Sequence, residues 1–319
     1  MQAVCRASPS LALIKYWGKA DPEENLPATS SLAVTLGGLN TETAVRFTEA
    51  EDRVVVDGRV QERRRFEAFF RRLRERLGTE RRFHAVSRND FPSAAGLASS
   101  SSGFAALTCA CARLAAAEPS DAELSEIARF GSASAARSIF GGFVVLRAGA
   151  RAAEPFLSAD HWPDLRIVLA ITTSHSKEFS SRWAMESTRK TSPYYDAWVR
   201  SSADLFPRAV DALKRRDLEE LGHFVRLSTM RMHAALLAGD PPLTYWLPST
   251  LAVLHECRRL REEGIGAWET ADAGPQVKIL CLESDVPRIA ERIEALPFGT
   301  RTRTAEPGGP PSCRLEQER

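Results

Sequence analysis

The amino-acid sequence predicts an α+β protein with two domains, and three features of the chain lead to this prediction. The chain has 319 residues, a length that allows one large domain or two domains of ordinary size. Up to about residue 160, short apolar segments of strand type alternate with helical segments, and we expect a mostly antiparallel sheet there. The composition then changes around residues 160–164, and long helical segments follow.

We therefore expect an N-terminal domain over residues 1–163 and a C-terminal domain over residues 164–305. Prolines, glycines and charged residues accumulate in residues 306–319. A segment of this composition cannot bury enough apolar surface to offset its ordering entropy, so we expect a disordered tail.

The overall composition is that of a globular protein without a strongly charged surface. Hydrophobic residues make up 44% of the chain and the formal net charge is only +2, which argues against general binding of nucleic acid. No apolar run approaches the roughly 20 residues that a transmembrane helix needs, and the N-terminus lacks the pattern of a signal peptide. These features predict a cytoplasmic protein that binds neither nucleic acid nor a membrane.

The cysteines are scattered along the chain, and no two of them form a Cys-x-x-Cys metal pair. Most lie in apolar stretches, so we expect reduced thiols. The six residues are Cys5, Cys109, Cys111, Cys257, Cys281 and Cys313.

The first candidate binding residues follow a short apolar run near the N-terminus. Residues 10–14 are mostly apolar, and Lys15, Tyr16, Trp17 and Lys19 come directly after them. Two lysines and a tyrosine so close together suit an anionic ligand. The end of a strand with solvated lysines has the same pattern.

The next part of the chain predicts strands, a hairpin and a helix. Residues 31–36 and 41–47 are of strand type, and Asp57-Gly58 is a two-residue hairpin signal. Apolar residues then recur at helical spacing over residues 66–77, with arginines on the other, solvated face. A strand over residues 83–88 leads into the next segment.

Residues 90–103 contain small residues and four consecutive serines, just before a segment that predicts a helix. Small side chains let backbone N–H groups approach an anion closely, and a helix N-terminus adds unpaired donors and a favourable dipole. The segment is neither a Walker A sequence nor a Gly-x-Gly-x-x-Gly motif, and a flexible Ser/Gly linker is the alternative. We expect a phosphate-binding loop with the contact residues Pro92, Ala95, Gly96, Leu97, Ser99, Ser100, Ser101 and Ser102. Serine hydroxyls can also hold a metal ion, and Ser100 and Ser101 are the candidates.

Residues 131–142 form a second dense stretch, in which Ser132, Ser134 and Arg137 are polar points among small residues. A short helix places Ser134 and Arg137 on one face. An arginine there suits a carboxylate or phosphate, which it can grip with two parallel hydrogen bonds. The alternative is a small-residue helix packed against the core with Arg137 exposed.

A buried strand over residues 165–172 leads into a polar loop over residues 174–182. This loop can bring His175, Lys177, Ser181 and Arg182 to a site, or it can be a mobile surface loop. Helices are predicted next, over residues 192–214, 218–236 and 248–263.

Asp272 lies in a tight turn between two predicted strands, with Ala271 and Ala273 beside it and Gly274 giving the backbone freedom. An aspartate at such a position is either a turn former or a reactive carboxylate. A last helix over residues 286–296 and an edge strand over residues 301–305 complete the expected elements.

With these segments in order, the chain resembles the mevalonate diphosphate decarboxylases, members of the small-molecule kinase superfamily that includes homoserine, galactose and mevalonate kinases. The resemblance extends from about residue 7 to residue 282, and its first and last specific segments together separate this family from the ordinary kinases. The specific segments are Ile14-Lys15-Tyr16-Trp17-Gly18-Lys19, residues 91–100, residues 131–142 and Asp272-Ala273-Gly274-Pro275. The resemblance implies the two-domain GHMP-type fold, with a ribosomal-S5-domain-2-like N-terminal part and a ferredoxin-like C-terminal part.

The resemblance also implies an ATP- and Mg²⁺-dependent decarboxylation. ATP phosphorylates the tertiary 3-hydroxyl of mevalonate 5-diphosphate, and loss of that phosphate and of carbon dioxide gives isopentenyl diphosphate. Asp272 would orient or deprotonate the hydroxyl, Lys15 would keep that carboxylate ionised, and Arg137 would hold the substrate carboxylate.

The other implied contacts divide between the substrate and the nucleotide. The 5-diphosphate would bind Tyr16, Lys19, Ser132, Ser134, Ser181 and Arg182. The phosphate-binding loop within residues 90–103 would cradle the ATP phosphates, with Lys177 near the nucleotide. A homodimer is usual in this family and is implied as well.

The chain departs from the family pattern at a few positions. The family usually has Asn where Ser10, Thr29 and Gln276 stand, a larger residue at Ala271 and a Cys at Ala136. Ser10 matters most, because its shorter side chain leaves room for water or for a different substrate. Three alternatives follow: an enzyme for mevalonate 5-phosphate, a kinase that stops after 3-phosphorylation, and a non-catalytic binding protein. The presence of Lys15, Arg137 and Asp272 together favours decarboxylation.

Overall fold

The computed structural model describes residues 1–91, 99–173 and 178–317. The expected elements of the N-terminal half are present. The helix predicted over residues 66–77 extends over residues 64–77 and is capped by Gly78. Its strands are β1 (Gln2–Ala7), β2 (Ser10–Ile14), β3 (Lys19–Asp21), β4 (Leu26–Pro27), β5 (Ser31–Gly37), β6 (Thr41–Thr48), β7 (Arg53–Val56), β8 (Arg59–Val60), β9 (Arg82–Asn89), β10 (Phe143–Leu146) and β11 (Glu154–Leu157). Its helices are α1 (Arg64–Leu77), α2 (Ser99–Leu114), α3 (Asp121–Gly131) and the 3-10 helices η1 (Ala133–Ile139) and η2 (Ala159–His161).

The C-terminal half is mainly helical, as predicted. Its strands are β12 (Leu165–Ile171), β13 (Trp268–Ala271), β14 (Val277–Leu282), β15 (Arg301–Pro307) and β16 (Ser312–Glu316). Its helices are α4 (Ser181–Thr191), α5 (Tyr195–Arg215), α6 (Leu218–Leu237), α7 (Pro248–Glu262), α8 (Val286–Glu294) and the 3-10 helix η3 (Glu283–Asp285). Among the described residues, no helix is both long and apolar enough to cross a membrane.

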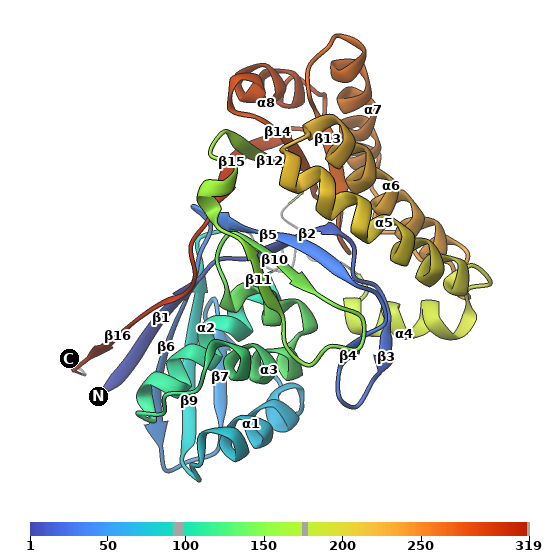
Figure 1. The fold of residues 1–319 in the computed structure, drawn as a ribbon. Coiled ribbons are helices and arrows are strands. Elements are labelled where there is room, and N and C mark those ends of the chain that lie inside the picture. The colour runs from blue at the N-terminus through green and yellow to red at the C-terminus, as the bar shows by residue number, and fades with distance from the viewer. Residues whose placement is uncertain (92–98, 174–177, 318–319) are drawn as a thin grey trace.

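Two larger sheets organise the chain. One has the strand order β16-β1-β6-β9-β7-β8, and its pairs are antiparallel except for β7 with β9. The other has the order β11-β10-β5-β15-β12-β14-β13, with β2 paired to β5. Figure 1 shows α1, α2 and α3 beside the first sheet and α5, α6, α7 and α8 around the C-terminal strands of the second.

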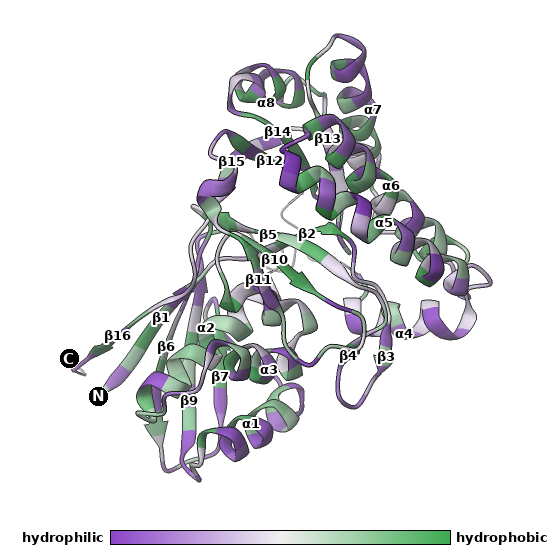
Figure 2. Ribbon diagram, in the orientation of Figure 1, coloured by the Kyte–Doolittle hydropathy of each residue, from purple (hydrophilic) through white to green (hydrophobic). Residues whose placement is uncertain are grey.

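Apolar side chains from both halves meet in one central core. Leu11, Val34 and Phe143 from the N-terminal strands pack in the same cluster as Leu165 and Phe224. Figure 2 shows β5 and β10 coloured largely as hydrophobic, whereas α1 alternates between hydrophobic and hydrophilic positions. The core continues across residue 163, so the domain division at that residue stays a prediction.

Residues 306–317 are ordered, contrary to the prediction of a disordered tail over residues 306–319. β16 pairs with β1 along Gln2 to Arg6, and the N–H group of Gly308 donates to the carbonyl of Thr35 at 2.8 Å. Composition misled the prediction, because Gly308 is needed for close packing: a Cβ there would lie 2.6 Å from the backbone nitrogen of Gly37. The pairing gives the backbone groups of β1 partners that an edge strand would lack.

Two further expectations about the C-terminal part of the chain are wrong. Cys5 and Cys313 face each other in the β1–β16 ladder and form a disulfide, whereas all six thiols were expected to be reduced. The remaining four cysteines are free and buried, in agreement with the prediction. β15 is an internal strand between β5 and β12 and not the expected edge strand.

Candidate active site

Asp272 follows β13 directly, and the turn that carries it is held by several hydrogen bonds. The N–H group of Gly274 donates to the Asp272 carbonyl at 2.8 Å, and Thr250 Oγ1 donates to the Pro275 carbonyl at 2.7 Å. Gln276 joins the same turn to the end of β12, since its Oε1 accepts from the Thr172 N–H at 2.6 Å. The carboxylate is therefore presented on a fixed backbone.

Lys15 lies just beyond the end of β2 and reaches Asp272 from the N-terminal half. Its Nζ is 2.6 Å from Asp272 Oδ1 and 2.9 Å from the Ala12 carbonyl, and only 1% of the side chain is exposed. A second lysine, Lys278 of β14, lies 3.0 Å from Asp272 Oδ2 and is equally buried. The carboxylate thus has an ammonium group on each oxygen.

The two lysines decide the ionisation of Asp272. Burial alone would raise the pKa of this carboxyl, but the charges and hydrogen bonds of Lys15 and Lys278 outweigh burial and hold the pKa well below its usual value. Burial lowers the pKa of Lys15 to about 8, although Asp272 acts in the opposite direction. At neutral pH the carboxylate is ionised and Lys15 is largely protonated.

Helix α6 supports both partners of this ion pair. Ser228 Oγ accepts a hydrogen bond from the Lys15 N–H at 2.9 Å. The ring of His233 lies under the turn, with Nε2 3.4 Å from the Ala271 carbonyl oxygen. Burial lowers the pKa of His233 to about 3, so this ring adds no charge beside Asp272 at neutral pH.

Arg137 lies on η1 and is buried, not exposed. Its Nε donates to Ser10 Oγ at 3.2 Å and its Nη1 to Ser31 Oγ at 2.7 Å. Burial lowers its pKa to about 10, so the guanidinium remains charged at neutral pH. Ser10, a departure from the family pattern, therefore positions Arg137. The backbone N–H group of Ser10 also donates to Ser101 Oγ at 3.2 Å. This hydrogen bond links the four consecutive serines, residues 99–102, to Arg137.

A group of cations and hydroxyls lies beside Arg137, around Lys19 and Arg182. Arg182 donates from Nη2 to the Gly131 carbonyl at 3.2 Å, which brings the first turn of α4 next to the Ser132–Ser134 segment. Burial, with the nearby Arg182 charge, lowers the pKa of Lys19 to about 8. The hydroxyls of Ser132 and Ser134 lie 3.0 Å apart. This arrangement suits an anionic ligand.

Two buried tyrosine hydroxyls complete this region, and neither has a hydrogen-bond partner among the described residues. They belong to Tyr16 and to Tyr195, the first residue of α5. Tyr195 approaches Gly18 so closely that any Cβ at Gly18 would collide with its hydroxyl, and Gly18 has φ +96°. Burial raises the pKa of both tyrosines, so both are neutral donors. Orphaned buried donors beside cations fit a phosphate group that is bound there.

The serine run divides into two pairs. Ser99 and Ser100 lie at the start of α2, with Ser99 half-buried and Ser100 exposed. Ser101 and Ser102 are fully buried, and Ser102 Oγ lies 2.6 Å from Thr41 Oγ1. The inward hydroxyls do not favour the expected metal role of Ser101. Pro92, Ala95, Gly96, Leu97, His175 and Lys177 lie outside the described residues, whereas Ser181 begins α4.

No cluster of three or more His, Cys, Asp or Glu side chains suitable for a metal ion occurs in the described parts of the chain. Mg²⁺ in nucleotide sites is usually held by few side chains together with phosphate oxygens. The exposed Ser100 at the helix start fits such a partial role.

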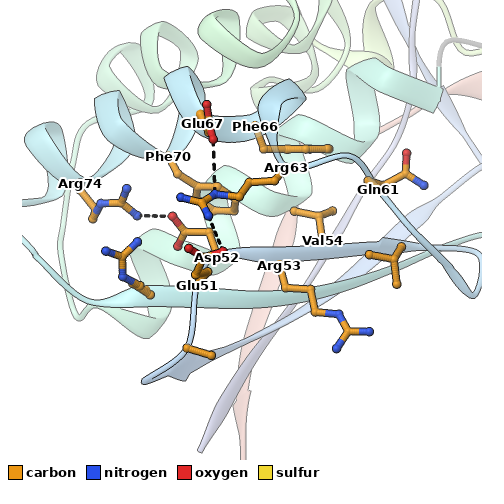
Figure 3. Close-up of a pocket in the computed structure, with 13 residues that line it drawn as sticks. Glu51, Asp52, Arg53, Val54, Gln61, Arg63, Phe66, Glu67, Phe70 and Arg74 are labelled. Atoms are coloured by element: carbon orange, nitrogen blue, oxygen red, sulfur yellow. Dashed lines mark hydrogen bonds and ion pairs between the residues drawn. The ribbon is translucent and has the colours of Figure 1, made fainter.

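A pocket between β7, β8 and α1 is separate from these residues (Figure 3). Its charged side chains already pair with one another: Arg74 lies 2.7 Å from Asp52, and Arg63 pairs with Glu51 and Glu67. None of its described lining residues belongs to the candidate site.

Sequence reasoning did not find Lys278 or Tyr195. Lys278 had one signal, a lysine in the otherwise apolar run of residues 277–282. Tyr195 had none, because its contact with Gly18 depends on the packing of α5.

Fold and site together define an α+β protein with a half-buried aspartate between two buried lysines and an adjoining anion-binding region. The comparisons agree with this class. A model described as the diphosphomevalonate decarboxylase-like N-terminal domain matches residues 7–156, and one for the mevalonate 5-diphosphate decarboxylase C-terminal domain matches residues 167–310. The chain belongs to the diphosphomevalonate decarboxylase family.

Individual relatives cover nearly the whole chain. The diphosphomevalonate decarboxylase of Aspergillus fumigatus is 34% identical over 92% of this chain and 80% of its own length. A solved structure described as MDDEF in complex with MVAPP, AMPPCP and magnesium is 32% identical, with a TM-score of 0.92 over 99% of both chains. The mevalonate diphosphate decarboxylase from Enterococcus faecalis is 33% identical, with a TM-score of 0.88 over 99% of both chains. These similarities confirm the predicted fold class.

Proposed function

We propose that this protein is an ATP- and Mg²⁺-dependent decarboxylase that converts mevalonate 5-diphosphate to isopentenyl diphosphate, ADP, phosphate and carbon dioxide. The observation that carries the proposal is Asp272, held between Lys15 and Lys278, with Arg137 and the Lys19–Arg182 region nearby. The family and its relatives support the substrate: the names of the solved structures include MVAPP or mevalonate diphosphate.

Asp272 acts on the hydroxyl at carbon 3 of the substrate. The ionised carboxylate accepts the hydroxyl hydrogen bond and aims the oxygen at the γ-phosphate of ATP, which is most of what phosphoryl transfer requires. A new oxygen–phosphorus bond forms, the bond between the γ-phosphorus and the bridging oxygen breaks, the hydroxyl proton passes to the Asp272 carboxylate, and ADP leaves. Lys15 stabilises the negative charge that develops on the attacking oxygen.

Arg137 holds the substrate carboxylate, with its guanidinium oriented by Ser10 and Ser31. The bond between carbon 3 and the phosphorylated oxygen then breaks and phosphate leaves. The electron pair of the bond to the carboxyl carbon becomes the double bond, and carbon dioxide is released.

The 5-diphosphate binds in the region of Tyr16, Lys19, Ser132, Ser134, Ser181 and Arg182. The buried hydroxyl of Tyr16 gains a partner when an anion enters, and Lys19 and Arg182 supply positive charge. The start of α2, with Ser99 and Ser100, holds the ATP phosphates. Magnesium, when bound, offsets the negative charge of those phosphates.

The decisive experiment measures carbon dioxide and ADP release with mevalonate, its 5-phosphate and its 5-diphosphate in parallel. We expect both products only with the 5-diphosphate. Release of both products from the 5-phosphate alone would change the assigned substrate, and ADP without carbon dioxide would indicate a kinase. If none of the three compounds led to release of ADP and carbon dioxide, the proposal would be wrong.

A homodimer and a cytoplasmic location are parts of the same proposal. The family resemblance supports the dimer, and the sequence composition supports the location. Light scattering of the purified protein tests the first, and fractionation of the source cells tests the second.

A further inference from the structure

Lys278 occupies a core position in the central sheet. It stands opposite Thr270 of β13 and Leu169 of β12, and its side chain is 1% exposed. Leu280, which points to the same face two residues further along β14, packs in the central hydrophobic cluster. An apolar side chain would be the ordinary choice here.

A lysine in this position carries a free-energy cost. Removing an ammonium group from water costs several kcal/mol, and replacing a buried ion pair by apolar residues is often neutral or stabilising. Asp272 already has Lys15 at 2.6 Å, so its charge is compensated without Lys278. Arg137 is also buried nearby. Lys15, Lys278 and Arg137 together therefore carry more positive charge than Asp272 compensates. Stability does not account for Lys278.

The geometry assigns Lys278 a different task. Lys15 contacts Oδ1 and Lys278 contacts Oδ2, so the carboxylate is restrained at both oxygens and cannot rotate freely about its bond to Cβ. One lysine arrives from the end of β2 and the other from β14, and neither depends on the other for its position.

We propose that Lys278 is a positioning residue for the phosphoryl-transfer step, which fixes the plane of the Asp272 carboxylate. Its positive charge also opposes the protonation of Lys15. The inference rests on the proposed function for its kinetic consequences but not for its effect on Lys15. The groups that face Lys15 are Asp272, Lys278, Arg137 and the neutral ring of His233. Among these, Lys278 and Arg137 oppose its protonation and Asp272 favours it.

The first test compares turnover in Lys278→Met, which keeps the length and apolar stem of the side chain, and Lys278→Arg, which keeps the charge. Lys214→Met is the matched control, because Lys214 is 54% exposed and pairs only at 3.6 Å with Asp211 among the ion pairs of the described residues. We expect Lys278→Met to lower kcat at least tenfold, with KM for ATP within about threefold. Lys278→Arg should recover part of this loss, and Lys214→Met should equal the wild type.

The pH profile separates positioning from a merely structural role. Activity needs protonated Lys15, so wild-type kcat should fall above about pH 8, where this lysine loses its proton. Removing the Lys278 charge removes a repulsion, so the fall should move to higher pH in Lys278→Met by about half a unit or more. In Lys278→Arg, the pH at which kcat falls should stay near the wild-type value. Thermal unfolding of Lys278→Met should occur no lower than in the wild type.

The second test needs no substrate. The chain contains only six lysines, so lysine-selective ¹³C labelling resolves the titration of Lys15, identified by its loss in Lys15→Met. The pKa of Lys15 should be near 8 in the wild type and higher in Lys278→Met. An unchanged Lys15 titration overturns the inference, even if kcat falls, because a folding defect would then explain the loss. A wild-type protein without turnover overturns the proposed function, while the titration still decides the role of Lys278.

Discussion

The Nζ atom of Lys15 lies 2.6 Å from Oδ1 of Asp272, although 257 residues separate them in the chain. Each residue is anchored on its own side, Lys15 through Ser228 and Asp272 through the turn at Gly274. The pair therefore joins the end of β2 to the end of β13. We therefore expect that replacing one member leaves the backbone position of the other intact.

Asp272→Asn should abolish most turnover and keep ligand binding. Asparagine fits the turn but lacks the negative charge that aims the hydroxyl. We expect turnover to fall at least a hundredfold, about 2.7 kcal/mol in the barrier, with substrate and ATP affinities within roughly tenfold, about 1.4 kcal/mol. Two buried lysines also lose their anion, so unfolding should become easier by about 3 kcal/mol. Steady-state kinetics, calorimetry and denaturant unfolding measure the three effects; near-normal turnover would make Asp272 a turn former only.

Lys15→Ala should lower turnover through the same unit as Asp272→Asn. Because the ammonium and the carboxylate act together, the double variant should be little slower than the slower single variant. Lys190→Ala is the control, since Lys190 is 63% exposed and pairs with Glu186 on α4. The turnover numbers of the two single variants, the double variant and the control show whether Lys15 and Asp272 act together. Losses that multiply in the double variant would show that the two residues act independently.

Ser99 and Ser100 should differ in function from Ser101 and Ser102. Replacing the first two by Ala should raise KM for ATP or lower kcat at least tenfold with unchanged stability, because Ala is a good helix residue. Replacing the second two should instead destabilise the fold by about 1–3 kcal/mol for each lost buried hydrogen bond, since the Ser10 N–H and Thr41 Oγ1 lose partners. ATP titration and unfolding curves of both double variants provide the comparison. The structure would be contradicted if replacing the first pair lowered the stability and replacing the second pair affected only ATP binding or turnover.

Tyr195→Phe should change affinity and stability in opposite directions. Its buried hydroxyl has no partner in the described structure, so removing it should leave the stability equal or higher. We expect the same hydroxyl to bind the substrate diphosphate, so KM should rise about fivefold, near 1 kcal/mol. Tyr194→Phe, at a neighbouring residue that is 59% exposed, should change neither quantity. An unchanged KM in Tyr195→Phe would remove Tyr195 from the binding region.

Cys313→Ser should lower stability without affecting turnover. The disulfide with Cys5 closes nearly the whole chain and lies in the β1–β16 ladder. We expect a loss of about 2–4 kcal/mol in the free energy of unfolding. A reductant should have the same effect on the wild type and none on the variant. Thiol titration of the denatured, unreduced wild type should find four free cysteines, and a count of six would show that the disulfide is absent.

Local patterns in the sequence were sufficient for most elements. The spacing of Phe66, Phe69, Phe70 and Leu73 predicted α1 and its buried face, because a helix repeats every 3.6 residues. Asp57-Gly58 predicted the β7–β8 hairpin, because that turn requires positive φ at both central residues. The order of residues 306–317 could not be predicted in this way. It depends on β1 and on the backbone near Gly37, which lie far away in the sequence.

The sequence by itself determined the α+β class, the candidate residues Lys15, Arg137 and Asp272 and, through its resemblance to a family, the expected reaction. These are properties of residue type and short-range order. Only the tertiary structure decided that Arg137 is buried against Ser10 and Ser31, and that Lys278 contacts the second oxygen of Asp272. The physical reason is that burial, and the charges and hydrogen bonds that shift a pKa, are set by neighbours from distant segments, which local sequence does not encode.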